Sequence, residues 1–343
     1  MKRYIALLLA MTMLLSFAAC KLNNTPPEST PATSGSAVGH YPITVTDQAG
    51  RQVTIEKEPQ RLISSYYITT SLLMALDLDE RLVGVEDNAG LRPIYDLSNP
   101  KILDLPNIGT AKELGLEACA ALAPDLAILP MKVKDSIDDL EALGIPVLIV
   151  NPESQELLTQ MIRLVAMATD TQEAAEALID FIETQENHLA EILSGVQTPS
   201  VYLSGNSSFL STAGNAMYQS DMIRLAGGKN VAGEIEDTYW AQIDYEQLLV
   251  WDPEYIILPS SAKHTIADVM ADPNLSECRA VLNGNVYQVP GDAESWDSPI
   301  PSSILGALWL ANILHPDLMT DTDCADIMDE YYETFYHFTY SET

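Results

Sequence analysis

The chain has 343 residues, of which 49 are Asp or Glu and only 17 are Lys or Arg, so its formal net charge is −32. Such an acidic surface disfavours binding to nucleic acid and direct adsorption to anionic lipid, because both partners are negatively charged. Apolar residues make up 47% of the sequence. A chain of this length and content is expected to form two domains with sizeable cores.

The first forty residues are expected to lie outside the fold. Two basic residues precede an apolar stretch at 5–15, which is too short for an ordinary spanning helix, so residues 1–20 are typical of a signal peptide. Small residues before Cys20 resemble a bacterial lipoprotein cleavage site and predict a lipid on this cysteine. The alternative is an ordinary signal peptide with an incidental Cys. Residues 21–40 are rich in Pro, Ser, Thr and Asn, which predicts a flexible stalk.

One segment near the middle of the chain has the pattern of a long amphipathic helix. Residues 171–193 contain neither Gly nor Pro, and their apolar residues follow the i, i+3, i+4, i+7 spacing of one buried stripe. Thr171 is a candidate N-cap, and Gly195 is placed to end the helix. At about 1.5 Å per residue the helix would be roughly 35 Å long. An ordinary surface helix fits the segment equally well, so its role depends on what flanks it.

Short apolar strands alternate with helices on both sides of this segment. Before it, we expect a hairpin at 43–55 and strands near 62–65, 81–85, 126–129 and 145–150. After it, we expect strands near 200–203, 255–258 and 286–289. This alternation is typical of βαβ units and parallel sheets. The predicted fold is α/β with two Rossmann-like lobes, divided into an N-terminal lobe at 41–170, an interlobe helix at 171–195 and a C-terminal lobe at 196–343.

An internal repeat supports two similar lobes. Residues 117–130 and 246–259 match without a gap, and both read E-x6-P-[DE]-x2-I-L-P. A helix, a proline break and a buried strand are common in α/β proteins, so one copy alone indicates little. The identical spacing of two copies, with the long helix between them, indicates two related lobes joined by a rigid spacer.

Ligands of open parallel sheets bind beyond the carboxyl ends of the strands, and two facing lobes would form a cleft there. The residues that follow the expected strands are therefore candidates for a ligand site. In the first half they are Tyr66, Tyr67, Asp87, Asn88, Arg92, Met131 and Lys132. In the second half they are Ser207, Phe209, Tyr239, Trp240, Ser260 and Trp296. Aromatic residues are unusual in solvent-facing turns, so the set predicts a ligand wall, although any single one is better explained by local packing.

Cysteine and histidine spacing gives no sign of a metal site. Beyond Cys20 the cysteines are Cys119, Cys278 and Cys324, far apart and without a CxxC pair. A Cys278–Cys324 disulfide is one option, and the odd count leaves at least one cysteine free. The five histidines are scattered without HxxxH, so no structural metal is expected.

Several motifs recur together along the chain. They include D-x-A-G-R-x-V-x-I at 47–55, R-L-V-G-V at 81–85, L-E-x-C-x-A-L-x-P-D at 116–125, L-A-G-G-K-N-V at 225–231 and W-D-S-P at 296–299. In these motifs the sequence resembles, from about Tyr41 to its end, the iron–siderophore, haem and vitamin B12 class of ABC-transporter substrate-binding lipoproteins. The resemblance implies two α/β lobes bridged by a single long helix, with a metal chelate captured between the lobes. It also implies a monomer held at the outer face of the membrane by its lipid alone, no other cofactor, and delivery to a permease dimer with its ATPase.

The resemblance assigns a role to the repeated glutamates. In the family one acidic residue on each lobe docks into an Arg pocket of the permease, and by position these are Glu117 and Glu246. Two carboxylates at a fixed separation suit a two-fold-symmetric partner, while simple solvation is the plain alternative for both. The family's ligand contacts correspond by position to Tyr66 or Tyr67, Asp87, Trp240 and Trp296. Ser71 stands where many relatives have Glu, which leaves the surrounding network open.

Other functions find less support in the sequence. No GxSxG, Walker loop, HExxH or GxGxxG motif is present, so an enzyme is not expected. A bare Zn or Mn site would need about three histidines in the cleft, and the expected rim has at most His264. Molybdate-type oxyanion binding is the alternative to a chelate, because Ser207 and Ser260 could serve an oxyanion. Strongly anionic chelates would need nearby cations, for which Arg92 and Lys132 are the candidates.

Overall fold

Two four-stranded sheets organise the described residues, 41–236 and 239–343 of a computed structural model. The signal peptide, the stalk and Cys20 lie outside these residues. The first sheet contains β3 (Leu62–Ser64), β4 (Leu82–Gly84), β5 (Leu126–Pro130) and β6 (Val147–Val150). The second contains β7 (Ser200–Leu203), β9 (Lys229–Asn230), β11 (Tyr255–Leu258) and β12 (Val286–Gln288). Every pairing within the two sheets is parallel, which confirms the predicted fold class.

The two sheets share one topology. The first has the order β4-β3-β5-β6 and the second has the order β9-β7-β11-β12, so in each the strands lie in the order second, first, third, fourth. The third strand of each, β5 and β11, belongs to the repeated sequence motif. Two small antiparallel pairs complete the strands: β1 (Ile43–Thr46) with β2 (Gln52–Ile55), and β8 (Ser211–Ala213) with β10 (Trp240–Gln242). The predicted hairpin at 43–55 is thereby confirmed.

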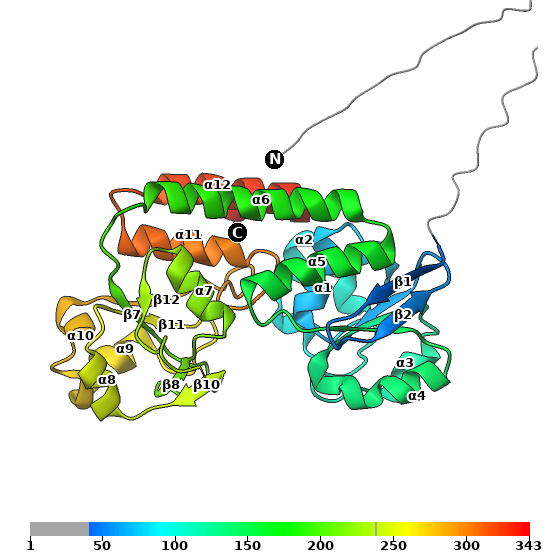
Figure 1. Cartoon of the computed structure of the whole chain (residues 1–343), viewed down its shortest axis with the longest axis horizontal. Helices are drawn as coiled ribbons and strands as arrows, with labels where there is room; N and C mark the ends of the chain where they lie inside the picture. The colour runs from blue at the N-terminus through cyan, green and yellow to red at the C-terminus, as the bar shows by residue number, and fades with distance from the viewer. Residues whose placement is uncertain (1–40, 237–238) are drawn as a thin grey trace, which may run out of the picture. The chain divides into compact units, whose positions relative to one another are not determined.

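Helices cover both faces of each sheet, as Figure 1 shows. On the first sheet they are α1 (Tyr67–Ala75), α2 (Pro93–Ser98), α3 (Leu116–Ala121), α4 (Ile137–Ala142) and α5 (Gln155–Thr169). On the second they are α7 (Tyr218–Leu225), α8 (Tyr245–Trp251), α9 (Ile266–Met270), α10 (Arg279–Asn283) and α11 (Ser303–Leu314). Small apolar cores lie under α3 and α4 and under α8 to α10. On the opposite faces one continuous core joins the two lobes.

The expected long helix is α6 (Gln172–Ile192), which runs along both lobes (Figure 1). Its apolar stripe is buried through residues such as Leu178, Ile182 and Leu189. Thr171 occupies the N-cap position, but its side chain makes no capping hydrogen bond and lies 3.0 Å from the Thr169 hydroxyl instead. The sequence thus predicted the position of the helix start correctly but not the bond that forms there.

A second helix also connects the lobes. The C-terminal α12 (Asp321–Tyr336) lies beside α6, with Phe181 of α6 at 5.3 Å from the ring of Tyr331. At its far end the Tyr336 hydroxyl lies 2.8 Å from that of Ser71 on α1. The sequence placed α12 wholly within the C-terminal lobe, whereas its last turn packs on the N-terminal one. Rigidity between the lobes therefore comes from two helices, α6 and α12.

Two further findings bear on the sequence expectations. Cys119, Cys278 and Cys324 are all buried and free, so the Cys278–Cys324 disulfide is not formed. Within the described residues, no helix is both long enough and apolar enough to cross a membrane.

Candidate functional site

The strand order fixes where a site can form. In a sheet ordered 2-1-3-4 the connections leave in opposite directions from the first and third strands, which opens a crevice at their carboxyl ends. In the first lobe this is the gap between β3 and β5, where a small recess is lined by Tyr66, Met131 and Lys132. In the second lobe it is the gap between β7 and β11, where Ser204 lies 2.9 Å from Nε2 of His264.

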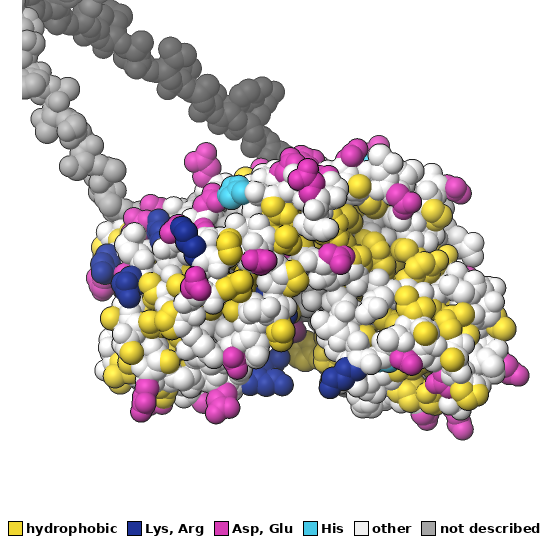
Figure 2. Space-filling model, turned by 180° about the vertical axis from the view of Figure 1, so that it is seen from behind, with side chains coloured by type: hydrophobic (Ala, Val, Ile, Leu, Met, Phe, Trp, Pro, Cys, Tyr) yellow, Lys and Arg dark blue, Asp and Glu magenta, His cyan; other side chains and the backbone are white. Residues whose placement is uncertain are grey.

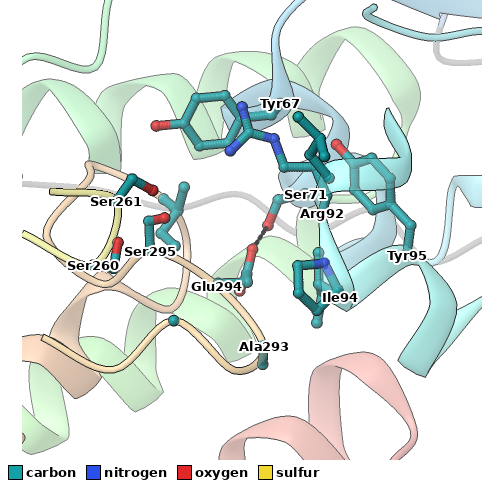
Figure 3. A pocket seen from close by; sticks show the side chains of 14 residues that line it. Tyr67, Ser71, Arg92, Ile94, Tyr95, Ser260, Ser261, Ala293, Glu294 and Ser295 are labelled. Carbon is teal, nitrogen blue, oxygen red and sulfur yellow. Dashed lines mark hydrogen bonds between the residues drawn. The ribbon is translucent and has the colours of Figure 1, made fainter. Parts of the chain in front are cut away.

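A cavity of about 130 Å³ lies between the loops of the two lobes (Figure 3). From the N-terminal lobe it is lined by Tyr67, Ser71, Leu91, Arg92, Pro93, Ile94 and Tyr95. From the C-terminal lobe it is lined by Ser260, Ser261, Gly291, Ala293, Glu294, Ser295 and Ile300. A backbone hydrogen bond from Ile94 to the carbonyl of Ala293 joins the two walls. Tyr67, Arg92 and Ser260 were predicted from the sequence, and the structure brings these three together.

Arg92 is the cation of this cavity. Its guanidinium carbon lies 4.0 Å from the centroid of the Tyr67 ring, a cation–π contact that Figure 3 shows as two stacked groups. Its Nε is buried without a hydrogen-bond partner among the described residues. A buried donor left unpaired costs stability, so Arg92 is well suited to receive an acceptor atom from a ligand.

Glu294 closes the floor of the cavity and links the lobes. Its two oxygens accept hydrogen bonds from Ser71 on α1 and from Ser302 just before α11, and Figure 3 shows the Ser71 bond. Burial raises the pKa of Glu294, while these hydrogen bonds and Arg92 lower it. Ser71, which stands in place of the family's frequent Glu, thus pairs with a carboxyl supplied by the other lobe.

Ser260 is held by a buried carboxylate of its own lobe. Its hydroxyl and its backbone N–H both donate to Oδ1 of Asp297, at 2.8 and 3.1 Å. Burial raises the pKa of Asp297, and the two bonds from Ser260 oppose that rise. The Ser260 hydroxyl donates its proton to Asp297, so its oxygen can only accept a hydrogen bond from a ligand in the cavity. Among the described residues, the side chains of Ser261 and Ser295 have no hydrogen-bond partner, so their hydroxyls can donate to a ligand.

The prediction that Trp296 forms part of the ligand wall is wrong. Its side chain is only 1% exposed, its Nε1 donates to the Tyr332 hydroxyl of α12 at 2.8 Å, and its ring packs on Tyr340. The loop from 291 to 295 lines the cavity, but the chain then turns inward. The sequence located the loop correctly and could not show which of its side chains point into the core.

The remaining candidates lie outside the cavity. Asp87 is exposed and accepts from the Asn107 amide and the backbone N–H of Asn88. Ser207 is exposed, and Phe209 packs edge-on against Tyr202 and His264. Tyr239 and Trp240, at the start of β10, are 50% and 38% exposed. These residues stay candidates for a wider ligand surface.

Figure 2 shows a hollow between the two lobes with Lys or Arg side chains on both of its sides. Asp and Glu side chains are scattered over the rest of the surface in that view, together with a second group of Lys and Arg side chains.

The two repeated glutamates keep equivalent positions. Glu117 lies in the first turn of α3 and Glu246 in the first turn of α8, and both are exposed. In Figure 1 both helices lie on the side away from α6. Their docking role stays a prediction.

Several functional candidates were not predicted as site residues. They lie in loops at strand ends or in a helix that follows such a loop, where ligands of parallel sheets usually bind: Glu86, Tyr95, Ser261 and Ser295. Glu294, which lines the cavity, is not among the residues predicted from the sequence. Its link to Ser71 spans 223 positions, and no local pattern predicts such a pair.

Comparison with known proteins agrees with this architecture. Residues 62–293 match the family described as Periplasmic binding protein, and the chain belongs to that family. It is 24% identical to the molybdate-binding protein MolA of Haemophilus influenzae, over 86% of this chain and 91% of MolA. The structure of MolA bound to molybdate superimposes with a TM-score of 0.77, covering 87% of this chain and 99% of that one.

Two other relatives extend the comparison. An uncharacterized ABC transporter substrate-binding lipoprotein of Bacillus subtilis, YvrC, is 26% identical over 91% of this chain and 96% of its own. A vitamin B12-binding protein of Yersinia pestis is 25% identical over 58% of this chain and 69% of its own. The chain is therefore a solute-binding protein of the ABC-transporter type, with an importer as the expected partner, and the family's members bind and carry solutes.

Proposed function

We propose that this protein is the extracytoplasmic receptor of an ABC importer, tethered to the outer face of the cell membrane by lipid on Cys20. It captures a small solute between its lobes and presents it to a permease dimer with its ATPase, docking through Glu117 and Glu246. Support comes from the family, from the lipoprotein YvrC among its relatives, and from the equivalent exposed positions of the two glutamates.

The ligand that fits the geometry best is a small oxyanion of the molybdate type. The observation that carries this choice is Arg92, a cation in the lining of a cavity of about 130 Å³, whose Nε is buried without a partner among the described residues. At about 30 Å³ per water molecule this volume holds roughly four waters, which suits a tetrahedral group of four oxygens. Donors at Ser261 and Ser295 complement such an anion.

A metal chelate, the preference from the sequence alone, is the second candidate. Pockets for organic ligands usually measure about 300–1,000 Å³, so a haem- or corrinoid-sized ligand would require the lobes to separate. The exposed rings of Tyr239 and Trp240 favour this candidate, because they could stack on a planar organic ligand. The vitamin B12-binding relative points the same way.

A thermal-shift screen of the purified protein separates the candidates. Sodium molybdate, sulfate, a ferric siderophore, haem and cobalamin are each added at a concentration near 100 times a micromolar Kd. Binding at that level adds about 2.7 kcal/mol to the free energy of unfolding, which raises Tm by roughly 5–10 °C in a protein of this size. A shift with molybdate that Arg92→Ala abolishes supports the oxyanion. A shift only with an organic chelate refutes it in favour of the second candidate.

A further inference from the structure

A buried glutamate is hydrogen-bonded to one residue of each helix that carries Tyr67 and Arg92. Glu86 follows β4 and is only 5% exposed. One of its carboxylate oxygens accepts a hydrogen bond from the Thr70 hydroxyl at 2.7 Å, and the other accepts one from the Tyr95 hydroxyl. The Thr70 hydroxyl oxygen also lies 3.0 Å from the Ser64 hydroxyl at the end of β3. A single carboxylate thus connects the ends of two strands to two helices.

The residues that bond Glu86 have the same spacing from the cavity residues on both helices. Tyr67 is the first residue of α1, and Thr70 lies three positions later, one helical turn further along. Arg92 is the N-cap of α2, and Tyr95 again lies three positions later. Residues three apart on a helix share a face, so each residue that bonds Glu86 is the helical neighbour of Tyr67 or of Arg92.

We propose that Glu86 is a positioning residue, which sets the spacing of Tyr67 and Arg92 and so the affinity of the site for an anionic group. By fixing the first turn of α1 and of α2 to the same carboxylate, it holds the guanidinium 4.0 Å from the Tyr67 ring in the lining of the cavity. The inference rests on the proposed function for its ligand, but its geometric part concerns the two side chains alone.

A carboxylate suits this place better than an amide. The two hydroxyl donors approach different oxygens of Glu86, and an amide would offer a donor N–H₂ to one of them. The hydroxyl that faces this N–H₂ would then have to donate its proton to another acceptor. Thr70 has the Ser64 hydroxyl and the Tyr66 carbonyl within reach, and Tyr95 has the Thr70 hydroxyl as a second partner. Replacement by Gln should therefore loosen the first turns of both α1 and α2, and Arg92 with α2.

The test combines a binding measurement with a ligand-free spectroscopic one. Glu86→Gln is compared with Asp96→Asn, a matched loss of one negative charge at an exposed position of α2. Sodium molybdate is titrated by calorimetry. The Arg92 Nε–Hε resonance, identified by its loss in Arg92→Lys, is followed by NMR, because a proton over the Tyr67 ring is shifted upfield. Since a hydrogen bond to a charged group is worth about tenfold in an equilibrium constant, we expect Glu86→Gln to weaken binding by about that factor.

We also expect the upfield shift to shrink in Glu86→Gln, with both readouts unchanged in Asp96→Asn. An unmoved resonance in Glu86→Gln, or an equal change in Asp96→Asn, overturns the positioning role. If the unmodified protein binds no molybdate, the oxyanion proposal fails while the resonance still decides the role of Glu86. If Glu86→Gln does not fold, Tyr95→Phe and Thr70→Val each remove one of the two bonds. A resonance that both of these leave in place overturns the inference.

Discussion

Replacing Trp296 with Ala should cost the protein stability instead of removing a ligand contact. The side chain is 1% exposed and packs between the loop after β12 and the C-terminal residues, with its N–H bonded to Tyr332. Truncating a buried Trp to Ala typically costs about 3–5 kcal/mol, because a cavity is left where the ring packed. At roughly 2–4 °C per kcal/mol, Tm should fall by about 10 °C.

The assay is thermal and urea unfolding followed by circular dichroism, with Trp240→Ala as the matched aromatic control. Trp240 is 38% exposed on β10, so its truncation should lower the free energy of unfolding by less than that of the fully buried Trp296. Trp296→Phe should recover part of the packing and still lose the bond to Tyr332. If Trp296→Ala melts within about 2 °C of the unmodified protein, the assignment of this side chain to the core is wrong.

Further outcomes follow from the docking residues, the buried carboxyl and the thiols. Glu117→Ala combined with Glu246→Ala should abolish ligand-dependent transport in cells while calorimetric affinity is preserved, and undiminished uptake would refute the docking role. Burial raises the pKa of Glu294, so the folded state holds that proton more tightly and this residue's contribution to stability falls as pH rises above about 4.3. The amount by which the free energy of unfolding of Glu294→Gln exceeds that of the unmodified protein should therefore become smaller as the pH is lowered from about 7 to about 4.5. A difference that does not change with pH would contradict a buried, titrating carboxyl. Burial also raises the pKa of Cys119 to about 11 and that of Cys324 to about 12, so peptide mapping should find both unalkylated by iodoacetamide at neutral pH unless denaturant is present.

Hydrophobic periodicity and the positions of Gly and Pro were sufficient to predict the elements that depend on local sequence. The stripe of α6, the hairpin at 43–55 and the repeated helix–Pro–strand unit could each be predicted, because side-chain spacing follows directly from helix and strand geometry. The candidate loops followed from the rule that ligands bind at the carboxyl ends of parallel strands. That rule brought Tyr67 and Ser260 into the candidate set without any knowledge of their contacts, and Arg92 entered it as a cation for an anionic ligand.

Distinguishing a cavity residue from a core residue was beyond the sequence. Trp240 and Trp296 are both aromatic residues near a strand end, yet one is partly exposed and the other is packed under α12. Their difference depends on whether a distant helix covers them, and a hydrophobic side chain is equally suited to a ligand wall or to an interior.

The sequence alone therefore determined the class of protein, the two lobes and the loops that face each other. Only the tertiary structure decided that Glu294 meets Ser71 across the lobes, that Glu86 bonds both Thr70 and Tyr95, and that α12 joins α6 in connecting the lobes. The sequence pattern shows the spacing of residues that are neighbours along the chain, whereas buried polar pairs form wherever folding brings a donor to an acceptor that has lost its water.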